Sequence, residues 1–277
     1  VRWIGRAGKG KGRANEGVRV QTLSLDEQVP LAASTRASAV AGGDLVLCAV
    51  RSTDTEAAGE QRRVHLKPGA VVLCLQDGVD NAERLRAVLP GVNVAAAVVY
   101  VATEMAGPGH LRHHGRGELV MEPMPSDPSR SAATAQAFTA AGVPTSLSDN
   151  VRGALWAKLI LNCAYNALSA LGHLPYGELV QRPGVLDVIG DVVAECKAVA
   201  TADGVILPSD LDAAVRRIAE TMPTQHSSTA QDLARGKPSE IDFLNGFVVR
   251  RGAALGVPTP ANRVLWTLVK LVESRTA

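Results

Sequence analysis

The sequence predicts an α/β protein in which an alternating strand–helix region precedes an all-helical region. The first observation behind this prediction is the rhythm of residues 1–148, where short apolar runs alternate with polar helical stretches. Such a rhythm is typical of a parallel sheet with crossover helices. The second is the helical periodicity that dominates after the last strand-like run, Pro144–Leu147. We therefore predict two domains, at residues 1–148 and 149–277.

Several runs in the first region have the composition of strands. Short strands are predicted at Val1–Ile4, Val18–Gln21, Val29–Ala32 and Pro144–Leu147. Longer apolar runs predict strands that are covered on both faces, at Asp44–Val50, Ala70–Leu75 and Val92–Val101. Helices are expected between these strands, at Thr53–Val64 and Asn81–Leu89.

The second region is expected to begin with a long helix. Ser148, Asp149 and Asn150 have side chains that cap helix N-termini, and the apolar segment Gly153–Leu171 follows them. Further helices are predicted at Val185–Asp203, Ser209–Glu220, Ser227–Arg235, Ser239–Leu255 and Pro260–Glu273.

Composition argues against several classes of function. The chain of 277 residues has 29 basic and 27 acidic residues, a balance that disfavours a dedicated nucleic-acid binder. The longest apolar run, Val94–Ala102, is too short to span a bilayer. The four cysteines lack metal or redox spacing, so buried reduced thiols in a cytoplasmic protein are expected. His113 and His114 have no third ligand nearby, which argues against a metal site.

A polar stripe runs through the long apolar helix. Lys158, Asn162 and Asn166 recur at four-residue intervals and therefore share one helix face. A buried ammonium costs several kcal/mol unless it is paired or used. Two interpretations remain open, namely a proton donor beside two hydrogen-bonding amides, and a lysine that reaches solvent above two satisfied core asparagines.

Residues that follow the predicted strands are candidates for ligand contacts. The glycine-rich stretch Gly5–Gly12 lacks the Ser or Thr of a P-loop. Arg6 either meets the 2′-phosphate of NADP or belongs to a solvated basic loop. Arg51 and Asp77 end buried strands, where α/β sheets bind ligands, but both also suit ordinary loops.

A cluster of small polar residues marks the second region. The segment Ser239–Asp242 is either a helix start favoured by the helix dipole or part of a pocket wall. The second interpretation draws on polar neighbours at Ser227, Ser228, Gln231, Asp232, Asn245 and Gly246.

Together these motifs resemble the 2-dehydropantoate 2-reductases, or ketopantoate reductases. The matching passages are Trp156-Ala-Lys158-Leu-x-x-Asn162-x-x-x-Asn166, Ser227-Ser228-x-x-Gln231-Asp232, Ser239-Glu240-Ile-Asp242-x-Leu-Asn245-Gly246 and Gly256-Val-Pro-Thr-Pro260-x-Asn262. The resemblance implies a Rossmann-like NADP-binding domain, a helical substrate domain and a cytoplasmic enzyme of pantothenate biosynthesis. The implied reaction is the NADPH-dependent reduction of 2-dehydropantoate to (R)-pantoate.

The resemblance also implies roles for residues around the substrate. Lys158 would be the general acid, and Glu240 would orient it and bind the substrate hydroxyl or the cofactor. Asn162 and Asn166 would hold substrate oxygens, and Ser228 the substrate carboxylate.

Four residues would contact the cofactor in addition to Glu240. By position, Arg6 would meet the 2′-phosphate of NADP, and Met105 would contact the cofactor after the strand at Val92–Val101. Arg51 and Asp77 would lie near the nicotinamide.

The chain departs from the family pattern in three places. The first strand and its G-x-G-x-x-G turn are missing, so we expect an N-terminally truncated Rossmann-like domain with a gap in its sheet. Asp77 replaces the usual asparagine, and its carboxylate would repel an anionic substrate unless it is protonated or paired. Arg51 replaces a common lysine, which keeps the charge but changes the geometry.

These departures leave two alternatives to the implied reaction. One is a non-catalytic family member that binds a partner or forms a homodimer through its helical domain. The other is a reductase of a different small 2-oxo acid.

Overall fold

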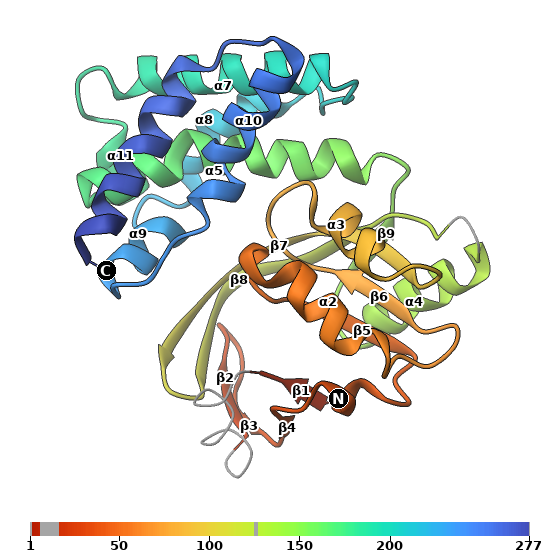
Figure 1. Ribbon diagram of the computed structural model, residues 1–277. Coiled ribbons are helices and arrows are strands. Elements are labelled where there is room, and N and C mark those ends of the chain that lie inside the picture. The colour runs from red at the N-terminus through yellow and green to blue at the C-terminus, as the bar shows by residue number, and fades with distance from the viewer. Residues whose placement is uncertain (1, 6–16, 125–126, 277) are drawn as a thin grey trace. The chain divides into compact units, whose positions relative to one another are not determined.

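The computed structural model describes residues 2–5, 17–124 and 127–276 (Figure 1). They fall into two units. The sheet unit comprises Val1–Val50, Asp54–Gln76 and Asp80–Val151. The helical unit comprises Arg152–Ala277 together with two short segments that follow strands in the chain, Arg51–Thr53 and Asp77–Val79.

The sheet unit contains a seven-stranded mixed sheet, in the order β3-β2-β8-β7-β6-β5 with β9 beside β8. Its strands are β2 (Val18–Gln21), β3 (Asp26–Val29), β5 (Leu45–Cys48), β6 (Val71–Cys74), β7 (Asn93–Gly107), β8 (His110–Met121) and β9 (Thr145–Leu147). The predicted parallel pairing is confirmed for β5, β6 and β7. The sequence predictions contain no strand at β8, which runs antiparallel to β7 because the chain reverses at Pro108 and Gly109, where Gly109 has a φ of 70°.

A second sheet is formed by β1 (Arg2–Ile4) and β4 (Ala32–Ser34), which pair in parallel. The single strand predicted at Val29–Ala32 is wrong, because β3 ends at Val29 and β4 begins at Ala32. Pro30 lies in the interruption, and proline has no backbone N–H to donate to a neighbouring strand.

Three helices belong to the sheet unit, namely α2 (Thr55–Arg63), α3 (Asn81–Val88) and α4 (Pro128–Ala140). Figure 1 shows them beside strands β5 and β6 of the larger sheet. The sheet core holds fully buried Leu73, Ala95 and Met121. The sequence predictions omitted α4, although Asp127 caps it by accepting a hydrogen bond from the backbone N–H of Arg130.

The helical unit is built around α5 (Val151–Gly172), which covers the whole predicted apolar segment. Trp156, Leu159, Ile160 and Cys163 are buried on its core face. The surrounding helices are α6 (Tyr176–Leu179), α7 (Val185–Ala202), α8 (Leu211–Thr221), α9 (Ser228–Ala234), α10 (Asn245–Leu255) and α11 (Pro260–Thr276).

The single helix predicted at Ser239–Leu255 is interrupted. A 3₁₀ turn, Ile241–Phe243, is followed by Leu244 with φ −107° and ψ −108°, and α10 begins only at Asn245. Asn245 is buried, and its side-chain amide donates to the carbonyl oxygen of Cys163 in α5. Asparagine favours helix ends over helix interiors, so the break is consistent with the local sequence.

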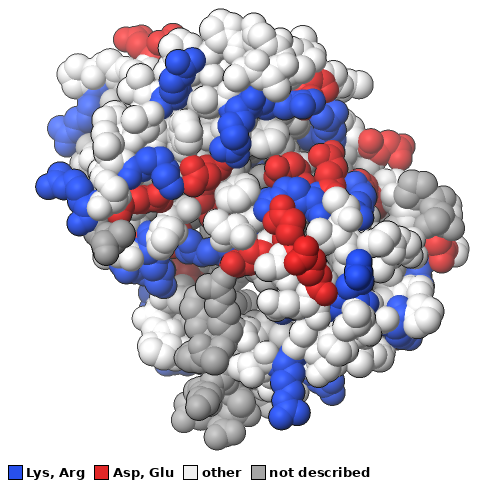
Figure 2. All heavy atoms as spheres, viewed as in Figure 1, with Lys and Arg blue, Asp and Glu red and all other residues white. Residues whose placement is uncertain are grey.

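The four cysteines are buried and free, as predicted. Burial raises the pKa of Cys48, and it raises the pKa of Cys74 to about 12, so both thiols stay protonated at neutral pH. Acidic and basic side chains are interspersed on the face drawn in Figure 2. None of the described helices is long and apolar enough to cross a membrane. The described residues also hold no cluster of three or more His, Cys, Asp or Glu side chains suited to a metal ion.

Candidate active site

The predicted polar stripe is present on α5. Asn166 is buried, whereas Asn162 and Lys158 are partly exposed, and the Lys158 side chain retains 25% of its accessible surface. The stripe thus runs from a partly exposed cation to a buried amide. This gradient leaves the ammonium accessible to a small molecule.

Lys158 forms an ion pair with Asp77, which belongs to the segment after β6. The distance from Nζ to Oδ1 is 2.6 Å, and the Asp77 side chain is 42% exposed. The Asp77 carboxylate, which was expected to repel an anionic substrate unless it is protonated or paired, is therefore paired. Because both groups are partly hydrated, the pair contributes little to stability.

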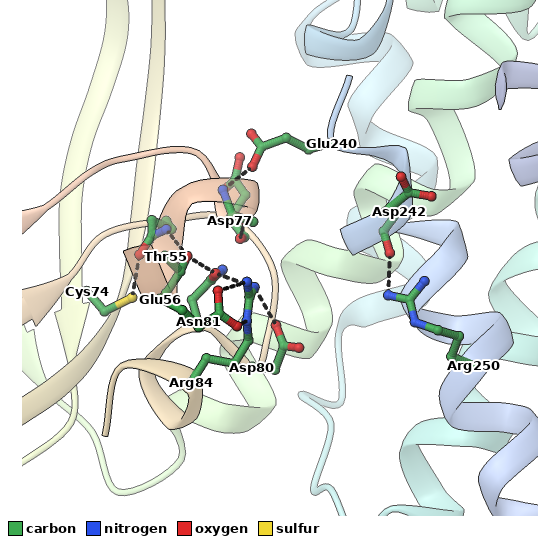
Figure 3. Close-up of polar contacts among 12 residues, drawn as sticks. Thr55, Glu56, Cys74, Asp77, Asp80, Asn81, Arg84, Glu240, Asp242 and Arg250 are labelled. Carbon is green, nitrogen blue, oxygen red and sulfur yellow. Dashed lines mark hydrogen bonds and ion pairs between the residues drawn. The ribbon is translucent and has the colours of Figure 1, made fainter. Parts of the chain in front are cut away.

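Ser52 connects Asp77 to Glu240. Its backbone N–H donates to Oε1 of Glu240 at 2.8 Å, and its hydroxyl donates to the carbonyl oxygen of Asp77 at 3.0 Å. Figure 3 shows the Glu240 carboxylate reaching toward the turn that contains Asp77. The hydrogen bond that the structure gives Glu240 is thus to Ser52, whereas the ion pair of Lys158 is with Asp77.

Arg51 is held by α9 and by the segment that follows it. Its guanidinium donates to Oδ1 of Asp232 and to the carbonyl oxygen of Pro238, both at 2.5 Å. We define the charged cluster as Arg51, Ser52, Asp77, Lys158, Asp232 and Glu240, all of which belong to the helical unit.

The far end of the stripe meets the start of α9. The Ser227 hydroxyl accepts from the N–H of Ala230, which caps the helix, and donates to the carbonyl oxygen of Asn166 at 3.0 Å. The Asn166 amide donates to the Ser228 hydroxyl at 3.4 Å. Ser228 is exposed, so its hydroxyl is accessible beside a buried amide.

Tyr176 also contacts the stripe and is absent from the sequence predictions. Its hydroxyl donates to Oδ1 of Asn166 at 3.4 Å. Burial, with a smaller contribution from Tyr165, raises the pKa of Tyr176, so the hydroxyl stays protonated. No local sequence pattern marks Tyr176, whereas Ser52 is recognisable as the neighbour of Arg51 at a strand end.

The segment that carries Glu240 is fixed by α11. Oε1 of Glu273 accepts from both the N–H and the hydroxyl of Ser239, each at 2.7 Å. Asp242 accepts from Nε1 of Trp266 at 2.7 Å and from Nζ of Lys270 at 2.9 Å. Burial opposes ionisation of Asp242, but the hydrogen bonds from Lys270 and Trp266 outweigh it and lower its pKa.

A separate polar network lies in the sheet unit (Figure 3). The Gln76 amide donates to Thr55 Oγ1 at 2.7 Å, and Thr55 donates to Oδ1 of Asn81 at 2.9 Å. Arg84 donates to Asn81 and forms a two-pronged ion pair with Glu56. This network fixes the end of β6, immediately before Asp77 in the chain.

Two further cofactor contacts were predicted, at Met105 and Arg6. Met105 is exposed on β7, opposite Leu111 of β8 in the sheet unit. Arg6 lies outside the described residues.

Comparison with known proteins shows the family of the chain. The model of the ketopantoate reductase PanE/ApbA family matches residues 1–126, and the model of its C-terminal domain matches residues 150–273. The chain belongs to the ketopantoate reductase family. It is accordingly an oxidoreductase of the class that interconverts ketone and CH–OH groups.

Curated relatives support this assignment. The 2-dehydropantoate 2-reductase of Halobacterium salinarum is 33% identical over 87% of this chain and 79% of its own length. The enzyme of the same name from Vibrio cholerae is 29% identical over 91% of this chain and 86% of its own length.

Solved structures share the fold. A PanE/ApbA family ketopantoate reductase from Ralstonia eutropha JMP134 is 61% identical, with a TM-score of 0.93 over 98% of this chain and 89% of that protein. A D-mandelate dehydrogenase, solved with NADH and anilino(oxo)acetate, is 21% identical, with a TM-score of 0.91 over 99% of this chain and 90% of its own. At that identity, the second likeness concerns the fold alone.

Proposed function

We propose that this protein reduces 2-dehydropantoate to (R)-pantoate with NADPH, and that Lys158 is the proton donor. The observation that supports this most strongly is the surroundings of Lys158. The partly exposed ammonium shares a helix face with two asparagine amides and lies 2.6 Å from a carboxylate. In a family of ketone reductases, an ammonium in such a setting suits the protonation of a developing alkoxide.

The polar groups at the strand ends fit the polar nicotinamide end of a dinucleotide. Parallel strands β5 and β6 end at Cys48 and Cys74, and the residues after them supply backbone groups, the Arg51 guanidinium and the Asp77 carboxylate. The crevice beyond the carboxyl ends of such strands is the general position of dinucleotides in α/β sheets. Arg51, Asp77 and Glu240 would hold this end, with Met105 and Arg6 as further proposed contacts. NADPH, when bound, supplies the hydride.

The protein side of the reaction concerns one proton and the substrate oxygens. As the carbonyl carbon gains a hydride, Lys158 gives a proton from Nζ to the carbonyl oxygen, and solvent later returns one to the amine. The ammonium also stabilises the negative charge that develops on this oxygen before transfer. Asn162 and Asn166 donate hydrogen bonds to substrate oxygens, and the Ser228 hydroxyl donates to the carboxylate.

Glu240 is proposed to complete the catalytic set. Its carboxylate is anchored by the Ser52 N–H at 2.8 Å and keeps a second oxygen for a substrate hydroxyl or a ribose hydroxyl of the cofactor. Because α11 fixes Ser239 and Asp242 on either side of it, Glu240 is positioned before any ligand arrives.

The test is NADPH oxidation with 2-dehydropantoate, followed for the wild type and Lys158→Ala. We expect kcat to fall by about 10²–10⁴-fold, the usual contribution of a general acid, while the melting temperature changes little. Lys197→Ala is the matched control, because Lys197 forms an exposed ion pair with Asp212 in the same unit. Near-normal turnover in Lys158→Ala would refute the assigned role.

Failure of the wild type to oxidise NADPH with 2-dehydropantoate would refute the proposed reaction. A parallel screen of other small 2-oxo acids then separates a reductase of different specificity, which the Asp77 carboxylate favours, from a non-catalytic family member.

A further inference from the structure

The charges of the candidate site do not favour an anionic ligand. Its two cations are each paired with a carboxylate, Lys158 with Asp77 and Arg51 with Asp232, at 2.6 and 2.5 Å. Glu240 adds a third carboxylate, which accepts from the backbone N–H of Ser52. Ser52 follows Arg51 in the chain, and its hydroxyl donates to the carbonyl oxygen of Asp77. Within the described part of the chain, this cluster has one negative charge in excess.

Asp77 is the carboxylate paired with the proposed proton donor, Lys158, and it offsets the positive charge there. Its carboxylate neutralises the cation on the polar stripe, and a substrate carbonyl that reaches Nζ must come close to it. An uncharged amide at this position would satisfy the same ammonium only as a dipole. The Asp77 carboxylate therefore lowers the electrostatic attraction between Lys158 and a substrate carboxylate.

We propose that Asp77 is a specificity-determining residue that weakens selection for anionic over uncharged 2-oxo compounds. The inference rests on the proposed reduction of a 2-oxo compound at Lys158. It predicts a site in which a carboxamide and a carboxylate of the same shape compete on nearly equal terms. Removing the Asp77 charge should restore the preference for the acid.

The variant Asp77→Asn tests this at almost constant shape. We would compare kcat/KM for 2-dehydropantoate with that for its primary amide, in the wild type and in the variant. Loss of one charge a few ångströms from the ligand in a partly hydrated site should raise the acid-to-amide ratio by about tenfold. The ratio cancels any general loss of catalysis, because both substrates undergo the same hydride and proton transfers.

The matched control is Asp212→Asn. Asp212 is also an aspartate paired with a lysine in the helical unit, but its side chain is 56% exposed on α8. This control should leave the ratio unchanged. A ratio that stays within about twofold of the wild type in Asp77→Asn overturns the inference and leaves the proposed reaction intact.

A binding measurement separates this inference from the proposed function. Calorimetric titration of pantoate and of its amide, pantoamide, needs neither cofactor nor turnover. If the wild type reduces neither substrate, the proposed reaction fails, but tighter relative binding of pantoate to Asp77→Asn still supports the inference. No change in relative binding overturns it.

The wild type alone gives a further check if Asp77→Asn does not fold. Pantoamide should then bind the wild type at least as tightly as pantoate does. Pantoate binding more than about tenfold tighter would overturn the inference, because it would mean that the cations of the cluster remain able to select an anion.

Discussion

Two polar clusters in the helical unit differ in burial and in chemistry. The amide cluster, which we define as Asn245, Asn262 and Glu195, surrounds the start of α11, and both asparagines are fully buried. The charged cluster contains ion pairs with partly exposed side chains. Residues of both clusters belong to the motifs that resemble the family. A motif by itself therefore does not show whether a residue has a structural or a catalytic role.

The amide cluster has the pattern of a structural network. Asn262 donates to the carbonyl oxygen of Val192 and to Glu195, and it accepts from the Asn245 amide at 3.0 Å. Glu195 also accepts from the backbone N–H groups of Ala261 and Asn262 at the start of α11. Such a network joins helices without presenting a group to a ligand.

The largest effect is expected when the amide cluster is broken. Asn262→Leu removes one of the two acceptors of the Asn245 amide and leaves polar groups of Val192 and Glu195 without that donor. The free energy of unfolding should fall by about 2–4 kcal/mol, since buried polar groups lose their hydrogen bonds. Urea unfolding measures this.

The turnover of Asn262→Leu shows whether Asn262 also acts in catalysis. The kcat per folded molecule should stay within a few-fold of the wild type at a temperature where the variant is folded. A large loss of kcat with unchanged stability would show that Asn262 acts in catalysis and not only in the structural network.

A smaller effect is expected at the packing beside the amide cluster. A Cβ atom at Gly252 of α10 would lie 2.8 Å from the carbonyl oxygen of Val257 and 2.9 Å from Cγ2 of Thr259. Gly252→Ala should therefore cost about 1–3 kcal/mol of stability through overpacking.

The control for this effect is Gly190→Ala in α7. A Cβ atom there would meet nothing within 4 Å, so the substitution should stabilise the protein by about 0.5–1 kcal/mol. Equal effects of the two substitutions in thermal melts would show that packing around the amide cluster is looser than the structure indicates.

The smallest effect concerns pH and the Asp242 carboxylate beside Glu240. Its pKa in the folded protein is lowered from the ordinary 3.8, so its ionisation stabilises the fold above that value. This stability is lost as the pH falls through the lowered pKa. As the pH is lowered from about 5 to 2, unfolding free energies should therefore fall less steeply in Asp242→Asn than in the wild type. Identical profiles would contradict the role of Lys270 and Trp266 in holding the charged form.

Much of the fold follows from local pattern. Helix α5 and the strands β5 and β6 are predicted because long apolar runs leave few alternatives. Strand β8 and its antiparallel pairing with β7 are missed, because the first part of β8, at residues 110–117, is polar and contains two glycines. Helix α4 is missed although Asp127 and Pro128 form a recognisable start.

The candidate site is predictable in its parts but not in its pairing. Spacing along α5 is sufficient to place Lys158, Asn162 and Asn166 on one face. No local pattern indicates that Asp77 reaches Lys158 or that Asp232 reaches Arg51, because these pairs join segments that are distant in the sequence. Ion pairs of this kind depend on the tertiary path of the chain.

Ser52 has a consequence for how the charged cluster tolerates change. The hydrogen bond to Glu240 comes from the backbone of Ser52, whereas the bond to the Asp77 carbonyl comes from its hydroxyl. Any residue except proline would keep the first bond, but only a residue with a side-chain donor would keep the second. Ser52 is 1% exposed, so only a small residue fits at this position. Ser52→Ala would therefore remove the restraint on the Asp77 turn while it keeps the backbone donor to Glu240.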